Sequence, residues 1–154
     1  MINELIPHSD EMLFIEKINS INVTGSSYLE MTLKEDSFYF ENKQFQVEWC
    51  IEFMAQAAGS VFSFTYTESK NKLSLGFLLS IDYFKILNDC IKYFKAGDLL
   101  IFEVKLMYDF SEIRKYYCKV IYNNIDYAVA EMKFIAKTKS DAEIKNEKSI
   151  FNWW

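Results

Sequence analysis

The sequence predicts a single α+β domain in which an antiparallel sheet curves around one long helix. The chain has 154 residues, the stretch 47–65 is apolar around most of its circumference, and the runs that follow it have strand patterns. Neither such a helix nor such a sheet can bury its apolar surface alone, so each must cover the other. We expect the domain to span residues 1–137 and the charged, aperiodic residues 138–154 to form a polar tail.

Two strands are expected before the helix. Residues 26–33 alternate between apolar and polar side chains, which is typical of a half-buried strand. Residues 17–23 are the expected hairpin partner, with a turn near Gly25. The other segments before the helix have no clear period. We expect an irregular or briefly helical lead-in at residues 4–14 and a loop at residues 35–46.

Four strands are expected after the helix. The first is almost entirely apolar, which is typical of a strand covered on both faces, and the others alternate. The pair Asn123–Asn124 predicts a tight hairpin turn, because Asn tolerates positive φ. The four expected strands are residues 73–81, 98–108, 116–122 and 126–136.

Composition narrows the classes of function. A net charge of -5, with Arg114 as the single arginine, argues against nucleic-acid binding, which needs clustered cations. No apolar run approaches the ~18 residues that cross a bilayer. The first residues lack the pattern of a secretory signal, so we expect a cytoplasmic protein.

The three cysteines are expected to be buried, reduced thiols. Cys50, Cys90 and Cys118 are widely separated and lack the paired spacing of metal ligands. The sequence therefore predicts neither a disulfide framework nor a metal site.

A narrow line of polar side chains runs along the otherwise apolar helix. Glu48, Glu52 and Gln56 lie at i, i+4 and i+8, and Gly59, Ser60 and Ser63 extend the line. If the line is enclosed, its carboxylates must be hydrogen-bonded or protonated, and a protonated Glu can donate its proton to a substrate. The alternative is that the line is the solvent-facing edge of an amphipathic helix.

Four stretches of the sequence resemble the hotdog-fold 3-hydroxyacyl-ACP dehydratases, where ACP is acyl carrier protein. They occur in the family's order and read LIPHSDEMLFIEKI at 5–18, IEFMAQAAG at 51–59, GFLLSIDYFKI at 76–86 and FKAGD at 94–98. The resemblance implies a sheet wrapped around the central helix, edge-to-edge pairing of two subunits and active sites at their interface. It also implies dehydration of thioesters carried on the phosphopantetheine of acyl carrier protein, with no further cofactor.

The resemblance assigns roles to particular residues. Glu52 takes the place of the catalytic glutamate and Gln56 that of its hydrogen-bonding partner at the substrate site. The family's second catalytic group is a loop histidine from the neighbouring subunit, and counting back without gaps places Phe38 there. Ser80 replaces a glycine at the substrate site and Ser9 an arginine, so the chain departs from the usual pattern at three positions.

The missing histidine matters because dehydration needs two groups. A base must take the α-proton and an acid must help the hydroxyl leave. His8, the single histidine, is the candidate for the second catalytic group, and a purely structural role is the alternative. The chain resembles most the ApeP-like branch of aryl-polyene dehydratases, which also lack the loop histidine and are associated with a second hotdog dehydratase. We therefore expect a homodimer or a heterodimer whose partner supplies that group.

A set of lysines is a candidate docking surface for the acidic carrier protein, although a solvated loop is an equal alternative. The set is Lys70, Lys72, Lys85, Lys92 and Lys95.

Three functions stay open from the sequence. The first is a 3-hydroxyacyl-ACP dehydratase with Glu52 as general acid. The second is a noncatalytic subunit that binds acyl carriers and stabilises an active partner. The third is a hotdog thioesterase, in which Glu52 activates water against the thioester carbonyl.

Overall fold

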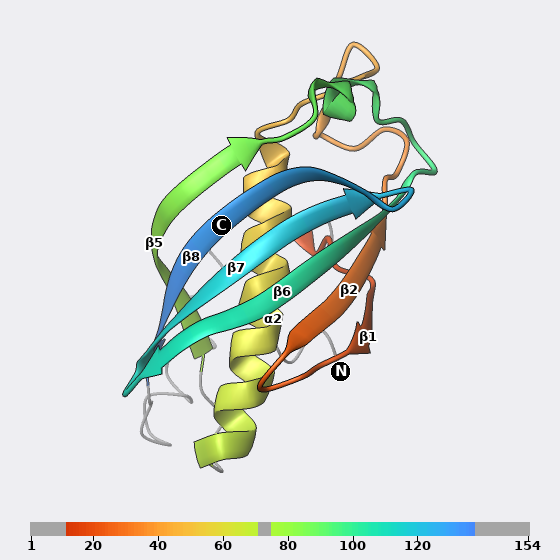
Figure 1. Cartoon of the computed structure of the whole chain (residues 1–154). Helices are drawn as coiled ribbons and strands as arrows, with labels where there is room; N and C mark the ends of the chain where they lie inside the picture. The colour runs from red at the N-terminus through yellow and green to blue at the C-terminus, as the bar shows by residue number, and fades with distance from the viewer. Residues whose placement is uncertain (1–11, 71–74, 138–154) are drawn as a thin grey trace.

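A curved antiparallel sheet of six strands packs against one long helix (Figure 1). The computed structural model describes residues 12–70 and 75–137. The helix is α2 (Trp49–Lys70), and the strand order across the sheet is β1-β2-β6-β7-β8-β5. The strands are β1 (Lys17–Ser20), β2 (Ser26–Thr32), β5 (Leu75–Ile86), β6 (Leu99–Phe110), β7 (Ile113–Tyr122) and β8 (Ile125–Lys137).

The expected α+β architecture is confirmed, and the helix is longer than expected at its C-terminal end. α2 continues past Thr65 to Lys70. Tyr66 explains the extension, because its ring is buried and stacks on Phe62 one turn earlier, with centroids 5.3 Å apart. Another turn of helix is therefore anchored in the core.

The segment expected to be a loop contains a small hairpin. β3 (Phe40–Glu41) pairs with β4 (Gln44–Phe45), and Asn42 and Lys43 between them have φ of 49° and 65°. Strands of two residues are too short to produce a sequence period, so alternation could not reveal them. The turn at Asn123–Asn124 is as expected, with φ of 50° and 61°.

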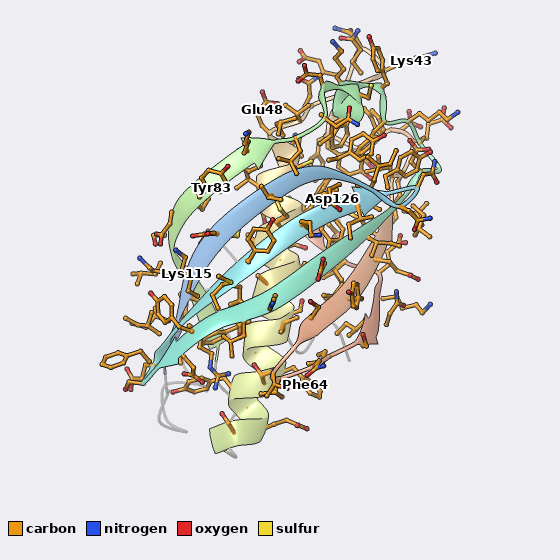
Figure 2. All side chains as sticks on the ribbon, in the orientation of Figure 1. Lys43, Glu48, Phe64, Tyr83, Lys115 and Asp126 are labelled. Carbon is orange, nitrogen blue, oxygen red and sulfur yellow. The ribbon has the colours of Figure 1, made fainter. Side chains whose placement is uncertain are left out.

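The core lies between the helix and the facing side of the sheet. In β7 every second residue is buried, so Tyr116, Cys118 and Val120 face α2. On the helix, Ala57 and Ala58 are fully buried, and their small side chains let the sheet approach closely. Lys115 and Asp126 lie on the opposite, outer face (Figure 2).

The single arginine joins the sheet to the C-terminal half of α2. Arg114 is 4% exposed, pairs with Asp109 at 2.8 Å, donates to Thr65 Oγ1 at 2.9 Å and lies over the Tyr66 ring. A buried guanidinium needs such partners to offset its desolvation. Arg114 thus has a structural role that its position in the sequence did not indicate.

The expectation for the cysteines is wrong at one position. Cys50 and Cys118 are buried free thiols, and burial raises the pKa of both. Cys90 is exposed, because it lies on the surface of the short 3-10 helix η2 (Asp89–Tyr93), in which Ile91 is the buried residue.

Within the described part of the chain, no helix has both the length and the apolarity that a membrane crossing requires.

Candidate functional site

Gln56 is the centre of the candidate site. It is 3% exposed, and its side chain makes three hydrogen bonds. The amide oxygen accepts from the backbone N–H of Phe14 at 3.0 Å, and Nε2 donates to the carbonyl of Met12 at 2.6 Å and to Glu52 Oε1 at 3.2 Å. Gln56 therefore fastens the segment before β1 to the helix and orients the Glu52 carboxylate.

The polar line on α2 passes from solvent into the core. Glu48 is exposed, Glu52 is half-buried, and Gln56, Ser60 and Ser63 are buried. The hydroxyl of Ser60 donates to the carbonyl of Gln56 at 2.8 Å, so this polar group is satisfied within the helix. The line is therefore solvent-facing at its N-terminal end and enclosed at its C-terminal end, and Glu52 lies at the boundary between the two.

An aromatic cluster surrounds the start of the helix, next to Glu52. The Phe14 ring contacts Phe38, Trp49 and Phe53, with centroids 5.7, 5.9 and 4.9 Å away. Phe38 and Trp49 also contact each other at 4.9 Å. Because the N–H of Phe14 is bonded to Gln56, the cluster and the Glu52–Gln56 pair are parts of one arrangement.

Two cavities meet at Phe38. The larger has a volume of about 680 Å³ and the smaller about 410 Å³, and Asp36, Ser37 and Phe38 line both. The smaller one extends along Leu13 and Phe14 toward the segment that Gln56 holds. Glu52 lines neither cavity, so both are separate from its carboxylate.

Ser80 belongs to a charged network on β5. Its hydroxyl donates to Asp82 Oδ1 at 2.7 Å, and Asp82 also pairs with Lys133 at 2.8 Å and with Lys115 at 3.1 Å. No hydrogen bond between the described residues joins Ser80 to Glu52, Gln56 or Phe38. Hydrogen bonds from Lys133, Ser80 and Lys115 hold the pKa of Asp82 well below its usual value.

This lowered pKa predicts a pH-dependent stability. A carboxyl whose pKa is lower in the folded state stabilises the fold above its unfolded value of about 4 and loses that contribution as the pH falls through the folded value. We expect Asp82→Asn to lower the thermal midpoint at neutral pH, and the difference from the wild type to shrink on acidification below about pH 4. Glu41→Gln, at an exposed position, is the control. A difference that stays constant down to strong acid would contradict this assignment.

Several predicted site residues lie outside the described residues. These include His8 and Ser9, so the catalytic role of His8 stays a prediction. Of the lysine set, Lys72 and the side chain of Lys70 also lie outside, whereas Lys85, Lys92 and Lys95 are exposed. The sequence missed Lys43, which lines the larger cavity with Lys95. Its neighbour Asn42, a frequent turn residue, was the available signal.

Comparison with solved structures supports the hotdog fold. A chain of the dehydratase heterocomplex ApeI:P from Xenorhabdus doucetiae matches with a TM-score of 0.75 at 17% identity, over 94% of this chain and 95% of that one. A hypothetical thioesterase with coenzyme A from Streptococcus pneumoniae matches with a TM-score of 0.62 at 10% identity, over 81% and 88% of the two chains. A Streptococcus mutans protein bound to acetyl CoA matches with a TM-score of 0.61 at 14% identity, over 81% and 90%.

Comparison by sequence identifies the family. No curated protein matches the chain significantly. The ApeP-like family model, described as ApeP dehydratase, matches residues 1–145, which is nearly the whole chain. This match shows that the chain belongs to the ApeP-like dehydratase family.

Proposed function

We propose that the chain is a subunit of a 3-hydroxyacyl-ACP dehydratase and that Glu52 is its general acid. The observation that carries the proposal is the hydrogen bond at 3.2 Å from Gln56 Nε2 to Glu52 Oε1. A buried amide with two further bonds to the backbone of Met12 and Phe14 holds this carboxylate in one orientation. Fixed orientation at the edge of an apolar core is what proton transfer to a bound substrate requires.

The reaction needs a second group besides Glu52. A base takes the proton from the α-carbon, the C–H electrons form the double bond, and the bond from the β-carbon to oxygen breaks. Glu52 donates its proton to the departing hydroxyl, which leaves as water, and the proton held by the base then restores Glu52. In this mechanism the general acid belongs to this chain, and another group has to act as the base.

We place the base in a second hotdog subunit. Phe38, at the position of the family's loop histidine, is packed against Phe14 and Trp49 and has no proton to exchange. The similar ApeI:P structure is described as a dehydratase heterocomplex, which supports a mixed dimer here. An interface site would also account for the absence of Glu52 from the linings of these two cavities, because the partner would supply the other wall.

The edge strand β5 is the proposed pairing surface. It lies at the end of the sheet and has exposed apolar side chains, including Leu78, Leu79 and Ile81. A long apolar edge offers unpaired backbone groups to another strand. We expect Leu79→Lys to reduce the dimer fraction in light scattering after size exclusion. Val23→Lys is the matched control, because Val23 and Leu79 are 51% and 52% exposed and only Leu79 is on this edge. Equal dimer fractions in both variants would exclude β5 as the interface.

Mass spectrometry of the carrier tests the proposed reaction. The substrate is 3-hydroxyacyl-ACP, incubated with this chain alone and with the chain co-purified with a second hotdog subunit. We expect the carrier to lose the mass of water only in the paired sample. Release of the whole acyl group would instead indicate a thioesterase.

Thioesterase activity is the second candidate because it needs only one carboxylate to activate water. Glu52 supplies this group without a histidine, and the solved structures of similar fold include proteins described as a hypothetical and a putative thioesterase. A noncatalytic role is the third candidate. In that case the paired sample should dehydrate 3-hydroxyacyl-ACP equally well when this chain carries Glu52→Gln.

A further inference from the structure

An apolar row crosses the outer face of the sheet over four neighbouring strands. Phe110 pairs with Ile113, and Ile113 pairs with Ile135. Ile135 in turn pairs with Phe77, so the row runs over β6, β7, β8 and β5. Directly paired residues point to the same face of a sheet, and Arg114, which follows Ile113, points toward the helix. The four side chains of the row therefore point away from the core.

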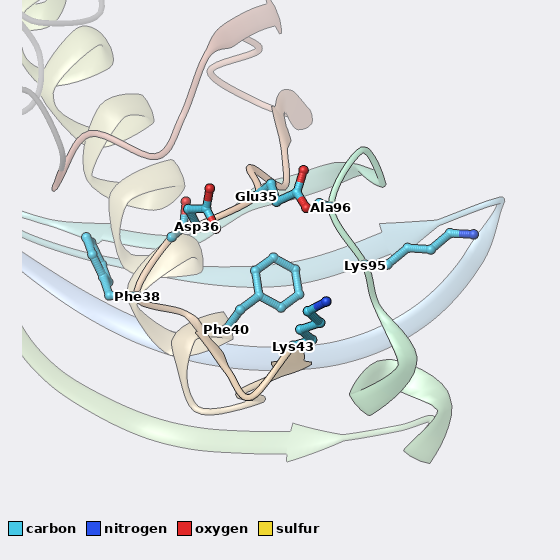
Figure 3. A pocket seen from close by; sticks show the side chains of 8 residues that line it. Glu35, Asp36, Phe38, Phe40, Lys43, Lys95 and Ala96 are labelled. Carbon is cyan, nitrogen blue, oxygen red and sulfur yellow. The ribbon is translucent and has the colours of Figure 1, made fainter.

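The row is separate from the cavities of the candidate site. Lys95 and Ala96, which line the larger cavity, shortly precede the first residue of β6, whereas Phe110 is its last residue (Figure 3). Successive residues of a strand rise by ~3.3 Å, so the two ends of β6 lie about 36 Å apart. A contact at the row is therefore independent of the proposed dehydratase site.

The row contrasts with the charged positions near it on the outer face. Lys115 and Lys119, which point outward from β7, each pair with two carboxylates from other strands. In the row, by contrast, Phe110 is 76% exposed and Phe77 is 38% exposed. Tyr108, beside Phe110 on β6, is also exposed. Exposed apolar side chains that adjoin one another mark a contact surface more often than isolated ones do.

The size of the row indicates a short segment as its occupant. Four neighbouring strands span about 14 Å, at ~4.8 Å between strands. A stable contact between two folded subunits needs about 800 Å² from each partner, which is more than four partly exposed side chains supply. An extended stretch of five residues is about 13 Å long and matches the row.

The chain itself contains such a segment. Residues 150–154 read IFNWW, with four apolar side chains in five positions, and they follow a polar, charged stretch at 138–149. The family match ends at residue 145, before this segment. β8 ends at Lys137, two residues after Ile135 of the row. Residues 138–149 can span up to about 40 Å, so the segment can reach every position of the row.

We propose that residues 150–154 pack on this row of their own chain. The indole rings of Trp153 and Trp154 then contact the phenyl rings that end the row, and aromatic pairs of this kind add to the burial of apolar area. A tethered segment binds as if it were present at about millimolar concentration, so a weak contact is enough to hold it. The contact covers the exposed apolar end of the sheet, and it does not depend on the proposed function.

Tryptophan emission tests this contact in the full-length protein. The chain has three tryptophans, and Trp49→Phe leaves Trp153 and Trp154 as the emitting residues. We expect their emission maximum to be blue-shifted relative to the same protein in denaturant. Adding Phe110→Asp should remove most of this shift, because docking the indoles would then bury a carboxylate without a partner.

Ile125→Asp is the matched control for the emission measurement. Ile125 is 48% exposed and begins β8, at the opposite end of that strand from Ile135. The same charge at this position should leave the emission maximum unchanged. Both aspartate variants should keep the thermal midpoint of the Trp49→Phe protein, since both substitutions are at exposed positions.

Amide shifts locate the contact without any substitution in the row. The nitrogen-15-labelled wild type is compared with a double variant that carries Trp153→Ser and Trp154→Ser. We expect differences at the row, which are residues 77, 110–113 and 135, and none at the opposite hairpin turn, residues 123–125.

Each possible outcome supports or overturns the proposal. A folded protein whose emission maximum equals that in denaturant, an equal effect of Ile125→Asp, or amide differences that leave out the row would each overturn it. A lower mass of Phe110→Asp in light scattering, with unchanged emission, would assign the row to a second copy of the chain and would also overturn it. Loss of the blue shift in Phe110→Asp alone, with amide differences at the row, would support the contact whether or not the paired sample dehydrates its substrate.

Discussion

Replacing Glu52 with Gln is expected to reduce the dehydration rate of the paired sample by about 10²- to 10⁴-fold, the usual contribution of a general acid. The amide keeps the shape of the side chain but has no acidic proton to give to the departing hydroxyl. Glu52 is only half-buried, so we expect the thermal midpoint to change little. The measurement is the single-turnover rate of water loss from the carrier, followed by mass spectrometry.

Glu48→Gln is the matched control for this prediction. Glu48 lies one turn earlier on the same line, carries the same group and is exposed. Its variant should dehydrate at the wild-type rate. An equal loss in both variants would show that the negative charge of the helix matters and that the position of Glu52 does not.

Replacing Gln56 with Leu is expected to affect stability and activity together. The change leaves the buried backbone N–H of Phe14 without its acceptor, which costs about 1–3 kcal/mol of unfolding free energy. It also removes the hydrogen bond that orients Glu52, and we expect a further rate loss of about tenfold from misplacement of the acid. Chemical denaturation measures the first effect and single-turnover kinetics the second.

Gln46→Leu provides the comparison for Gln56→Leu. The side-chain amide of Gln46 donates an exposed hydrogen bond to the carbonyl of Gln44 at 3.1 Å, so losing this hydrogen bond leaves no buried group without a partner. Little change in either measurement is expected there. Wild-type stability and rate in Gln56→Leu would contradict the account of how Glu52 is held.

The regular elements could be predicted because their burial leaves a period in the sequence. β7 shows this directly, since alternate residues from Arg114 to Val120 face the helix. The β3–β4 hairpin leaves no such period, because each strand has two residues. The exposure of Cys90 was missed for a related reason, since the 3-10 helix that carries it is a short surface segment.

The candidate site was predictable only in its local part. Helical spacing alone places Gln56 beside Glu52, and the structure confirms the contact. The bonds of Gln56 to Met12 and Phe14 join residues more than 40 positions apart, and no local pattern encodes such a pairing. The change from exposed Glu48 to buried Gln56 depends on where the sheet ends over the helix, which is a property of packing.

Deuterium incorporation at the α-carbon distinguishes dehydration from hydrolysis of the thioester. Dehydration and its reversal in deuterated water exchange the α-proton of the 3-hydroxyacyl group, whereas hydrolysis of the thioester leaves the α-carbon untouched. For the paired sample we predict that the recovered 3-hydroxyacyl-ACP becomes heavier by one deuterium, and that Glu52→Gln slows this gain by about 10²- to 10⁴-fold. Recovery of undeuterated substrate together with free acid, or exchange at the wild-type rate by Glu52→Gln, would contradict the claim that Glu52 transfers a proton in dehydration.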